Sequence, residues 1–332
     1  MVDLVERLDV LLAQEEGTYT TVDYLTPDHQ RKLLLTCGDD YDSLVESSSA
    51  YASSSCSSSN SGINEFWREK IVEWSYQVID HFDYSREVVS VSIHYLDRFL
   101  AARHVNKKSF QLAAMTSLFL AVKLYEPGRI SMSSMIELSR GYFTVSQLAN
   151  MELELLRVLS WQVHPPTAYC FSKHILFLMP YTSISMDSRH DILELTRFLA
   201  ELSVIDYFFV ARKGSSVALA ALLNSMDEIP AVSKEAKEAF YNELQRIKGI
   251  DAESPEVLDC RERLRLLYAQ GGYSRPESGA GTRNDAVISP VCVSYSFTTP
   301  YQGNPAAEQT QLTEPKSTAT APTAEGSSTT LL

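Results

Sequence analysis

Apolar residues recur at helical spacing between about residues 64 and 268. One stripe consists of Trp67, Ile71, Trp74, Val78 and Phe82, and a second of Val89, Ile93, Leu96 and Leu100. Such spacing places the residues of each stripe on one face, so each stripe predicts an amphipathic helix. From about Lys107 to Tyr125 the apolar residues cover nearly all sides, which predicts a helix surrounded by others.

Two further helices complete this first group. A short helix is expected around Ser133 to Arg140, and Thr144 with Gln147 forms a capping box that opens the next one. That helix carries an apolar face of Leu148, Met151, Leu155 and Leu159. Pro165-Pro166 cannot continue a helix and Thr167 is a good cap for a new one, so we place a domain boundary here.

The second half repeats the scheme. A long helix with Ile192, Leu195, Leu199 and Leu202 precedes an apolar one near Val217 to Leu223. A helix near Ala236 to Ile247 follows, and Ser254-Pro255 opens the last. We therefore predict an all-α protein of two consecutive five-helix bundles, over residues 63–164 and 165–270.

The flanking regions lack this pattern. Residues 1–62 are acidic and end in a serine tract, and we interpret them as a flexible N-terminal region. Residues 271–332 are rich in Gly, Ser, Thr and Pro, and we expect a disordered tail.

Composition narrows the functional classes. A net charge of −13 argues against direct binding to nucleic acid or an anionic membrane surface, and the longest apolar run is too short to span a bilayer. The five cysteines form no metal-binding or disulfide pattern, and no phosphate-binding loop or catalytic signature occurs. We therefore expect neither a cofactor nor a metal nor an enzymatic activity, and protein partners instead.

Two acidic residues occupy unexpected positions. Asp97 lies close to the second apolar stripe, and Glu152 close to the stripe that contains Leu155. A buried carboxylate needs a cationic partner, and Arg68 and Lys123 are the candidates. For Arg68 with Asp97 we favour a structural ion pair, whereas for Lys123 with Glu152 the spacing leaves a structural and a functional role equally open.

Several of these segments resemble the cyclin box. Residues 68–74, Arg-Glu-Lys-Ile-Val-Glu-Trp, resemble the opening of the box, and residues 95–100, Tyr-Leu-Asp-Arg-Phe-Leu, its second-helix signature. Residues 121–126, Ala-Val-Lys-Leu-Tyr-Glu, and residues 150–159 match the third and fifth helices in the same order. The second half resembles the second cyclin fold only in its pattern and its Pro-Pro-Thr entry.

The resemblance implies a regulatory subunit without catalytic activity that binds and activates a cyclin-dependent protein kinase. In cyclins, the residues that match Lys123 and Glu152 hydrogen-bond to the kinase backbone. Apolar positions that match Leu112, Leu124 and Trp161 receive the mobile helix of the kinase small lobe. The resemblance also implies a location in the nucleus, the cytoplasm or both.

The resemblance also implies a second, substrate-docking patch at Trp67, Ile71, Trp74 and Gln111. This chain departs from the family there, because Trp67 replaces a common methionine and Lys70 an apolar residue. A charged Lys70 would weaken an apolar groove. The alternative is that Trp67 and Trp74 are core residues.

Short motifs lie outside the box. Leu35, Cys37 and Asp39 resemble the element with which D-type cyclins bind retinoblastoma-type pocket proteins, with aspartate in place of glutamate, and this favours a G1-type role. Ser289 and Thr299 each precede a proline and are candidate phosphorylation sites. A cyclin that serves a transcriptional kinase and, less favoured, a cyclin-like transcription factor remain alternatives.

Overall fold

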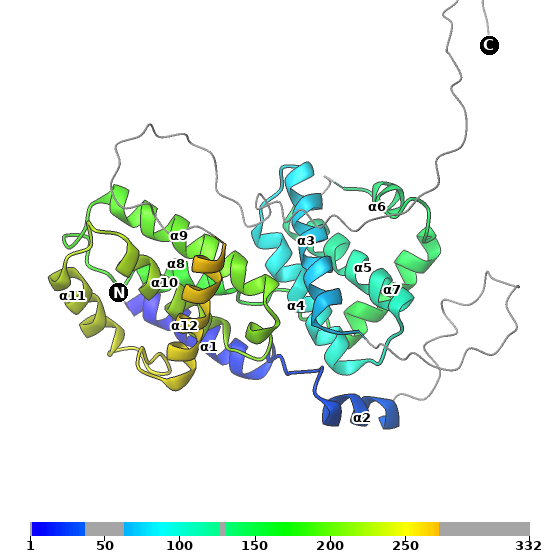
Figure 1. Cartoon of the computed structure of the whole chain (residues 1–332), viewed down its shortest axis with the longest axis horizontal. Coiled ribbons are helices and arrows are strands. Elements are labelled where there is room, and N and C mark those ends of the chain that lie inside the picture. Colours follow the sequence, from blue (N-terminus) through cyan, green and yellow to red (C-terminus); the bar gives the residue numbers. More distant parts are fainter. Residues whose placement is uncertain (1, 37–62, 127–129, 272–332) are drawn as a thin grey trace, which may run out of the picture. The chain divides into compact units, whose positions relative to one another are not determined.

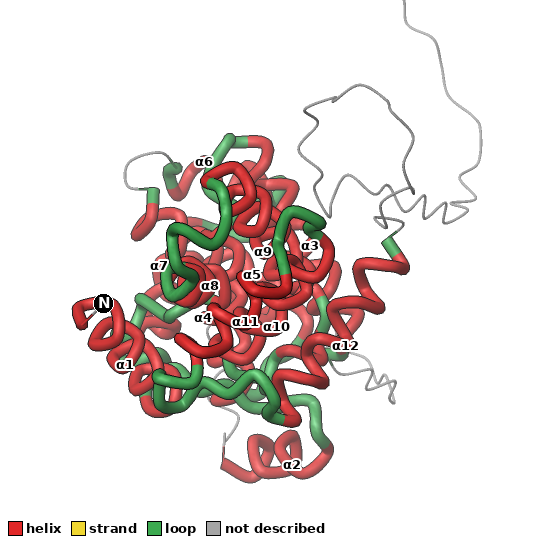
Figure 2. The backbone as a smooth tube through the Cα atoms, turned by 90° about the vertical axis from the view of Figure 1, so that its left-hand side faces the viewer, coloured by secondary structure: helices red, strands yellow, loops and turns green. Residues whose placement is uncertain are grey.

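The computed structural model describes residues 2–36, 63–126 and 130–271. Within these ranges the chain consists of α-helices, one short 3-10 helix and connecting loops, without a strand (Figures 1 and 2). The predicted all-α fold class, with two consecutive five-helix bundles, is confirmed.

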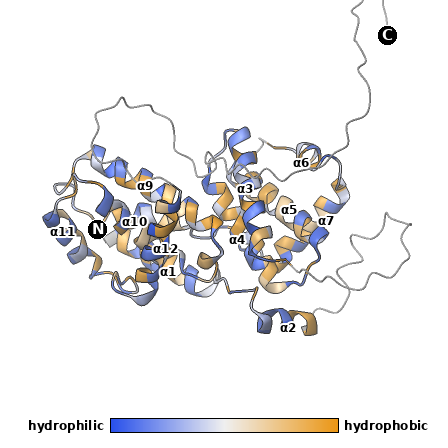
Figure 3. Cartoon of the chain, viewed as in Figure 1, coloured by the Kyte–Doolittle hydropathy of each residue, from blue (hydrophilic) through white to orange (hydrophobic). Residues whose placement is uncertain are grey.

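The first bundle surrounds one central helix. Its members are α3 (Glu65–His81), α4 (Glu87–Ala102), α5 (Lys107–Tyr125), α6 (Met132–Leu138) and α7 (Val145–Val158). Helix α5 is buried from Ser109 to Val122 apart from Gln111, and it packs against the other four. Apolar positions are prominent on α4 and α5 (Figure 3). The all-round apolar pattern of residues 107–125 therefore identified the central helix.

Local signals determine where these helices begin. The side chains of Asn64, Asn106, Ser131 and Thr144 each accept a hydrogen bond from a backbone N–H in the first turn of the following helix. At Thr144 the reciprocal bond from Gln147 is also present, so the predicted capping box forms. Each cap satisfies an amide that the helix itself leaves unpaired.

Three helix ends in this bundle use a left-handed residue that is not glycine. Asp83, Arg140 and Ser160 follow α3, α6 and α7 with φ of 56°, 52° and 53°. At each end the next residue's N–H donates back to the carbonyl five residues earlier, which is the hydrogen-bond pattern of a Schellman motif. An L-residue in this conformation costs about 1 kcal/mol, so all three turns are mildly strained.

The second bundle has the same arrangement around α10. Its members are α8 (Ala168–Leu176), α9 (Met186–Ile205), α10 (Gly214–Glu228), α11 (Lys234–Leu244) and α12 (Pro255–Gln270), with the short helix η2 (Tyr207–Phe209) between α9 and α10. Helix α10 is buried from Ser215 to Met226 and packs against α8, α9 and α12. Thr167 and Ser254 cap α8 and α12, as their sequence positions predicted.

The N-terminal region differs from the prediction. Instead of a wholly flexible segment, residues 2–36 contain α1 (Val2–Gly17) and α2 (Pro27–Thr36). Leu8 and Leu12 of α1 are buried in the core of the second bundle. The helical spacing of Leu4, Leu8 and Leu12 was the available signal, but the polar, acidic character of the region obscured it. The serine tract and the predicted tail lie outside the described residues.

Candidate interaction surface

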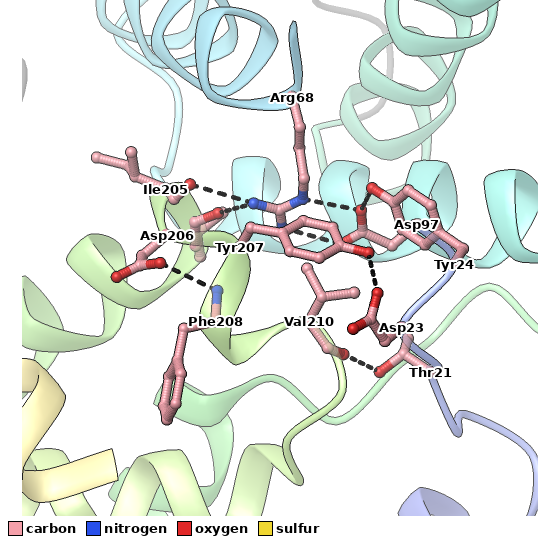
Figure 4. Close-up of polar contacts among 11 residues, drawn as sticks. Thr21, Asp23, Tyr24, Arg68, Asp97, Ile205, Asp206, Tyr207, Phe208 and Val210 are labelled. Carbon is pink, nitrogen blue, oxygen red and sulfur yellow. Dashed lines mark hydrogen bonds and ion pairs between the residues drawn. The ribbon is translucent and has the colours of Figure 1, made fainter. Parts of the chain in front are cut away.

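A buried ion pair joins α3 to α4. Nε of Arg68 donates to Oδ1 of Asp97 and Nη2 donates to Oδ2, both at 2.9 Å (Figure 4). The two side chains are only 4% and 6% exposed. Burial alone would lower the pKa of Arg68, but the carboxylate of Asp97 reverses this and the pKa is raised. Arg68 therefore stays charged, in the pairing that the sequence analysis expected.

The remaining donors of Arg68 reach the second bundle. Its Nη1 atom donates to the carbonyl oxygens of Val204 at 2.7 Å and Ile205 at 3.2 Å, at the C-terminal end of α9 (Figure 4). The carbonyls at a helix C-terminus carry partial negative charge and lack partners within their own helix. One guanidinium thus satisfies a carboxylate in the first bundle and the end of a helix in the second.

The segment between α1 and α2 covers this junction. Tyr24 donates to Oδ1 of Asp97 at 2.9 Å, and the hydroxyl of Tyr207 donates to Asp23 at 2.8 Å (Figure 4). Thr21 donates to the carbonyl of Val210. The sequence analysis missed these contacts, since they join residues more than 70 positions apart and no local pattern indicates them.

A second ion pair lies at the surface. Nζ of Lys123, in the last turn of α5, donates to Oε1 of Glu152 on α7 at 2.8 Å. The Lys123 side chain is 54% exposed, whereas that of Glu152 is 10% exposed. The ammonium group has three donor positions, so the bond to Glu152 leaves two for a partner molecule.

Exposed apolar side chains occur on the same two helices. Leu124 at the end of α5 is 37% exposed and Leu153 on α7 is 41% exposed. Trp161 is 65% exposed and follows Ser160 in the left-handed turn that ends α7, with a φ of 61° itself. A left-handed conformation is rare for a bulky residue. Together with the Lys123–Glu152 pair, these three residues form what we call the α5–α7 face.

Leu112 does not belong to this face. Its side chain is 2% exposed and lies in the core of the first bundle. Its position on the central helix is enclosed by neighbouring side chains of that core, and the expected contact with a partner stays a prediction. The apolar character of Leu112 alone could not distinguish a core position from an exposed position that contacts a partner.

The predicted docking patch is partly assembled. Ile71, Trp74 and Gln111 line one groove of about 860 Å³. Trp67 does not line it, and its ring lies 5.2 Å from Nζ of Lys107 instead. Lys70 is also outside the lining and donates to Glu73 at 2.8 Å. Lys70 is therefore not among the residues that line the groove, and its effect on substrate docking stays a prediction.

Most residues of the short motifs lie outside the part of the chain that the structure describes. Leu35, in the last turn of α2, is 83% exposed, whereas Cys37, Asp39, Ser289 and Thr299 lie outside the described residues. Across the described ranges, no group of three or more His, Cys, Asp or Glu side chains is arranged to hold a metal ion. Nor does any described helix combine the length and apolar character that crossing a membrane requires.

Comparisons with known proteins agree with this architecture. Residues 39–164 match the family model of the cyclin N-terminal domain, and residues 166–276 match that of the cyclin C-terminal domain. A G2/mitotic-specific cyclin-2 of Medicago sativa is 29% identical over 160 residues, which is 48% of this chain and 47% of that protein. Cyclin-B1-2 of Arabidopsis thaliana is 27% identical over 213 residues, or 64% of this chain and 45% of that protein.

A solved structure shows the same fold. A viral cyclin from herpesvirus saimiri superimposes with a TM-score of 0.53 and 16% identity, over 63% of this chain and 87% of that one. The chain spans about half the length of the curated relatives named above. The two matched domains follow one another along the chain and coincide with its two helical bundles. The chain therefore belongs to the cyclin family.

Proposed function

We propose that this cyclin is the non-catalytic regulatory subunit of a cyclin-dependent protein kinase, which it binds and activates. The observation that carries the proposal is the α5–α7 face, where a half-exposed Lys123 is oriented by Glu152 beside exposed apolar side chains. Exposed apolar groups next to an oriented charge favour association with a protein partner. The cyclin resemblance indicates that this partner is a kinase.

The proposed mechanism is selection of an active kinase conformation. Leu124, Leu153 and Trp161 would be buried against the mobile helix of the kinase small lobe, and Lys123 would donate to backbone carbonyls of the kinase. Binding of that helix in its inward position allows its glutamate to pair with the catalytic lysine. The kinase can bind the α5–α7 face only when its mobile helix is in the inward position. Binding therefore shifts the kinase population toward this active conformation.

Finer assignments belong to the same proposal. We infer a G1-type role from the motif that begins at Leu35, with a retinoblastoma-type pocket protein as a further partner and the nucleus or cytoplasm as location. The relatives reported above are named G2/mitotic cyclins or B1-type cyclins, so the G1-type role stays a prediction. The groove at Ile71, Trp74 and Gln111 is proposed to bind segments of kinase substrates.

The α5–α7 face can be tested by charge reversal. We expect Lys123→Glu and Glu152→Lys each to reduce activation of the cognate kinase at least about tenfold, since each leaves two like charges adjacent and removes a partner of the kinase backbone. Lys248→Glu makes the same charge change on an exposed residue of the second bundle and should leave activation unchanged. Full activation by both reversed variants, with normal circular dichroism spectra, would refute the proposed face.

The identity of the kinase decides between the alternative roles. Affinity capture of the full chain from its own cells, followed by mass spectrometry of the bound kinases, should recover a kinase of the division cycle. Recovery of a transcriptional kinase alone would assign the chain to transcription instead of the division cycle. Recovery of no kinase would overturn the proposed function.

A further inference from the structure

A cavity of about 450 Å³ lies at the junction of the two bundles. Its wall draws on three parts of the chain: Ile93 and His94 of α4, Val204 of α9 with Val217 of α10, and Tyr19 of the segment between α1 and α2. Protein interiors are close-packed, and voids larger than a water molecule are few. Small organic ligands usually occupy sites of about 300–1,000 Å³, so this cavity is large enough for one.

The cavity has a fixed side and an exposed side. On the fixed side Tyr19 is 7% exposed, and its hydroxyl accepts a hydrogen bond from the N–H of His164 at 3.2 Å. On the exposed side Glu16 and Lys213 belong to the lining, although their side chains are 64% and 47% exposed. A ligand would therefore enter beside this exposed ion pair, without displacing the segment that contains Tyr19.

One polar atom of this wall lacks a partner. Nε2 of His94 is buried and makes no hydrogen bond with the residues that the structure describes, which is rare and destabilises a folded protein. The imidazole as a whole is partly accessible, and its centroid lies 5.9 Å from that of the Tyr19 ring. The torsion that turns a histidine ring is broad, so a rotation of the ring can bring this nitrogen to a ligand. A large void and an unpartnered nitrogen thus occur at one place, and a single ligand would account for both.

The charges around the cavity are balanced. Three acidic and three basic side chains line it: Glu15, Glu16, Asp97, Arg68, Arg212 and Lys213. Arg68 is paired with Asp97, as described above. Lys213 donates to Glu16 at 2.9 Å, and the guanidinium of Arg212 lies over an aromatic ring at 4.7 Å. The lining thus carries no net charge to attract an ion, and transfer of an ion from water is costly, so a neutral ligand is favoured.

The uncharged part of the wall is largely apolar and aromatic. Tyr169 and Phe209 contribute rings in addition to that of Tyr19, and Ile93 and Val204 contribute branched aliphatic side chains. Aromatic side chains pack favourably against the face or the edge of another ring. These residues therefore favour a flat aromatic ligand over a flexible polar one.

We propose that this cavity binds a neutral, flat aromatic molecule that carries a carboxamide or a similar group, and that His94 forms the hydrogen bond that selects it. A neutral imidazole has one nitrogen that donates and one that accepts. A carboxamide can both donate and accept, so it pairs with either tautomer of His94. The inference goes beyond the proposed function and does not depend on it. Because both bundles and the segment with Tyr19 form the wall, the ligand would contact all three at once.

The test measures the binding of four naphthalene probes to the full chain by ligand-observed NMR titration, without kinase. The probes are naphthalene-2-carboxamide, naphthalene, the anion 2-naphthoate and the cation 2-naphthylmethylammonium. We expect the carboxamide to bind about tenfold more tightly than naphthalene, as one buried hydrogen bond supports, and at least about tenfold more tightly than either ion. A carboxamide that does not bind, or that binds no better than naphthalene or than either ion, would overturn the inference.

A variant of His94 tests the hydrogen bond. His94→Phe keeps an aromatic ring without a nitrogen, so the carboxamide should bind about as weakly as naphthalene, whose own affinity should hardly change. His104→Phe makes the same change at an exposed histidine that does not line the cavity, and it should leave all four affinities unchanged. A preference for the carboxamide that persists in His94→Phe would refute the role of His94.

A second variant tests the cavity itself without altering His94. Ser90 lies one turn before His94 on α4 and also lines the cavity, so the ring of Ser90→Phe would fill part of the space. We expect all four probes to bind at least about tenfold more weakly to it, while its circular dichroism spectrum stays helical. Unchanged affinities would mean that the probes bind elsewhere and would overturn the inference. Because no kinase is present, these results are independent of the proposed function.

Discussion

Asp97 takes part in two interactions at once, accepting both bonds of Arg68 and the hydroxyl of Tyr24. Asp97→Ala would leave the guanidinium buried without a counter-charge. We expect a loss of about 3–5 kcal/mol in the free energy of unfolding, measured by urea denaturation. Asp28→Ala, which removes an exposed ion pair with Arg31, should cost less than about 1 kcal/mol. Similar losses for the two variants would contradict the importance of burial.

His94 predicts a pH dependence of stability. Its buried Nε2 atom has no hydrogen-bond partner among the described residues, and burial lowers the pKa of His94 from 6.5 to about 4, assisted by Arg98. Between these two values the unfolded chain binds a proton that the folded chain does not. Stability should therefore fall as the pH drops from about 6.5 to about 4, with a slope of at most about 1.4 kcal/mol per pH unit from this group.

Comparison with His94→Phe isolates that contribution. Glu15 and Glu201 have pKa values that burial raises, so they favour the folded state at low pH and oppose the effect of His94. Both carboxylates are present in the variant and in the unmodified protein, so their contributions cancel when the stabilities of the two proteins are compared. Urea denaturation at pH 7 and pH 5 should show that His94→Phe loses less free energy of unfolding between these pH values than the unmodified protein does. Equal losses in the two proteins would exclude a buried neutral histidine.

At the scale of elements, α1 is the helix whose role the sequence analysis missed. Leu8 is fully buried and Leu12 is 9% exposed within the second core. Glu15 accepts hydrogen bonds from the backbone N–H and the hydroxyl of Ser215, in the first turn of α10. A carboxylate at this position pairs with unsatisfied amides and with the positive end of the helix dipole. Helix α1 thus contributes both apolar contacts and a cap to the second bundle.

This arrangement predicts that α1 stabilises the second bundle. Leu8→Ala should lower the free energy of unfolding by about 2–5 kcal/mol, because it leaves a cavity in the core. Val10→Ala, on the exposed side of α1 at 56% exposure, should change it by less than about 0.5 kcal/mol. Hydrogen exchange should also show faster exchange in α8 and α10 for Leu8→Ala. Unchanged stability would mean that α1 is not docked in solution.

At the scale of the whole molecule, polar contacts join the two bundles at several points. Arg86, at the start of α4, donates to Glu201 on α9 at 2.9 Å. Thr167 donates to Glu87 at 2.8 Å, and Arg68 bonds to the carbonyls at the end of α9. Most of these groups are largely buried, so separating the bundles would leave charged groups without partners. The two repeats are therefore held together as one structural unit.

The sequence by itself determined the helices and their order in both bundles. The apolar period from Lys107 to Tyr125 and the caps at Thr144, Thr167 and Ser254 act over a few residues, so local pattern was sufficient. Charged residues within apolar stripes also indicated the pairing of Arg68 with Asp97. The cyclin motifs could be read from the same residues.

Only the tertiary structure decided which side chains are exposed and which distant residues meet. Leu112 and Leu124 are equally apolar, yet one is 2% and the other 37% exposed, because neighbouring helices enclose the first and not the second. The contacts of Tyr24 with Asp97 and of Glu15 with Ser215 join residues remote in the chain. Burial and pairing depend on packing between elements, which a linear pattern does not contain.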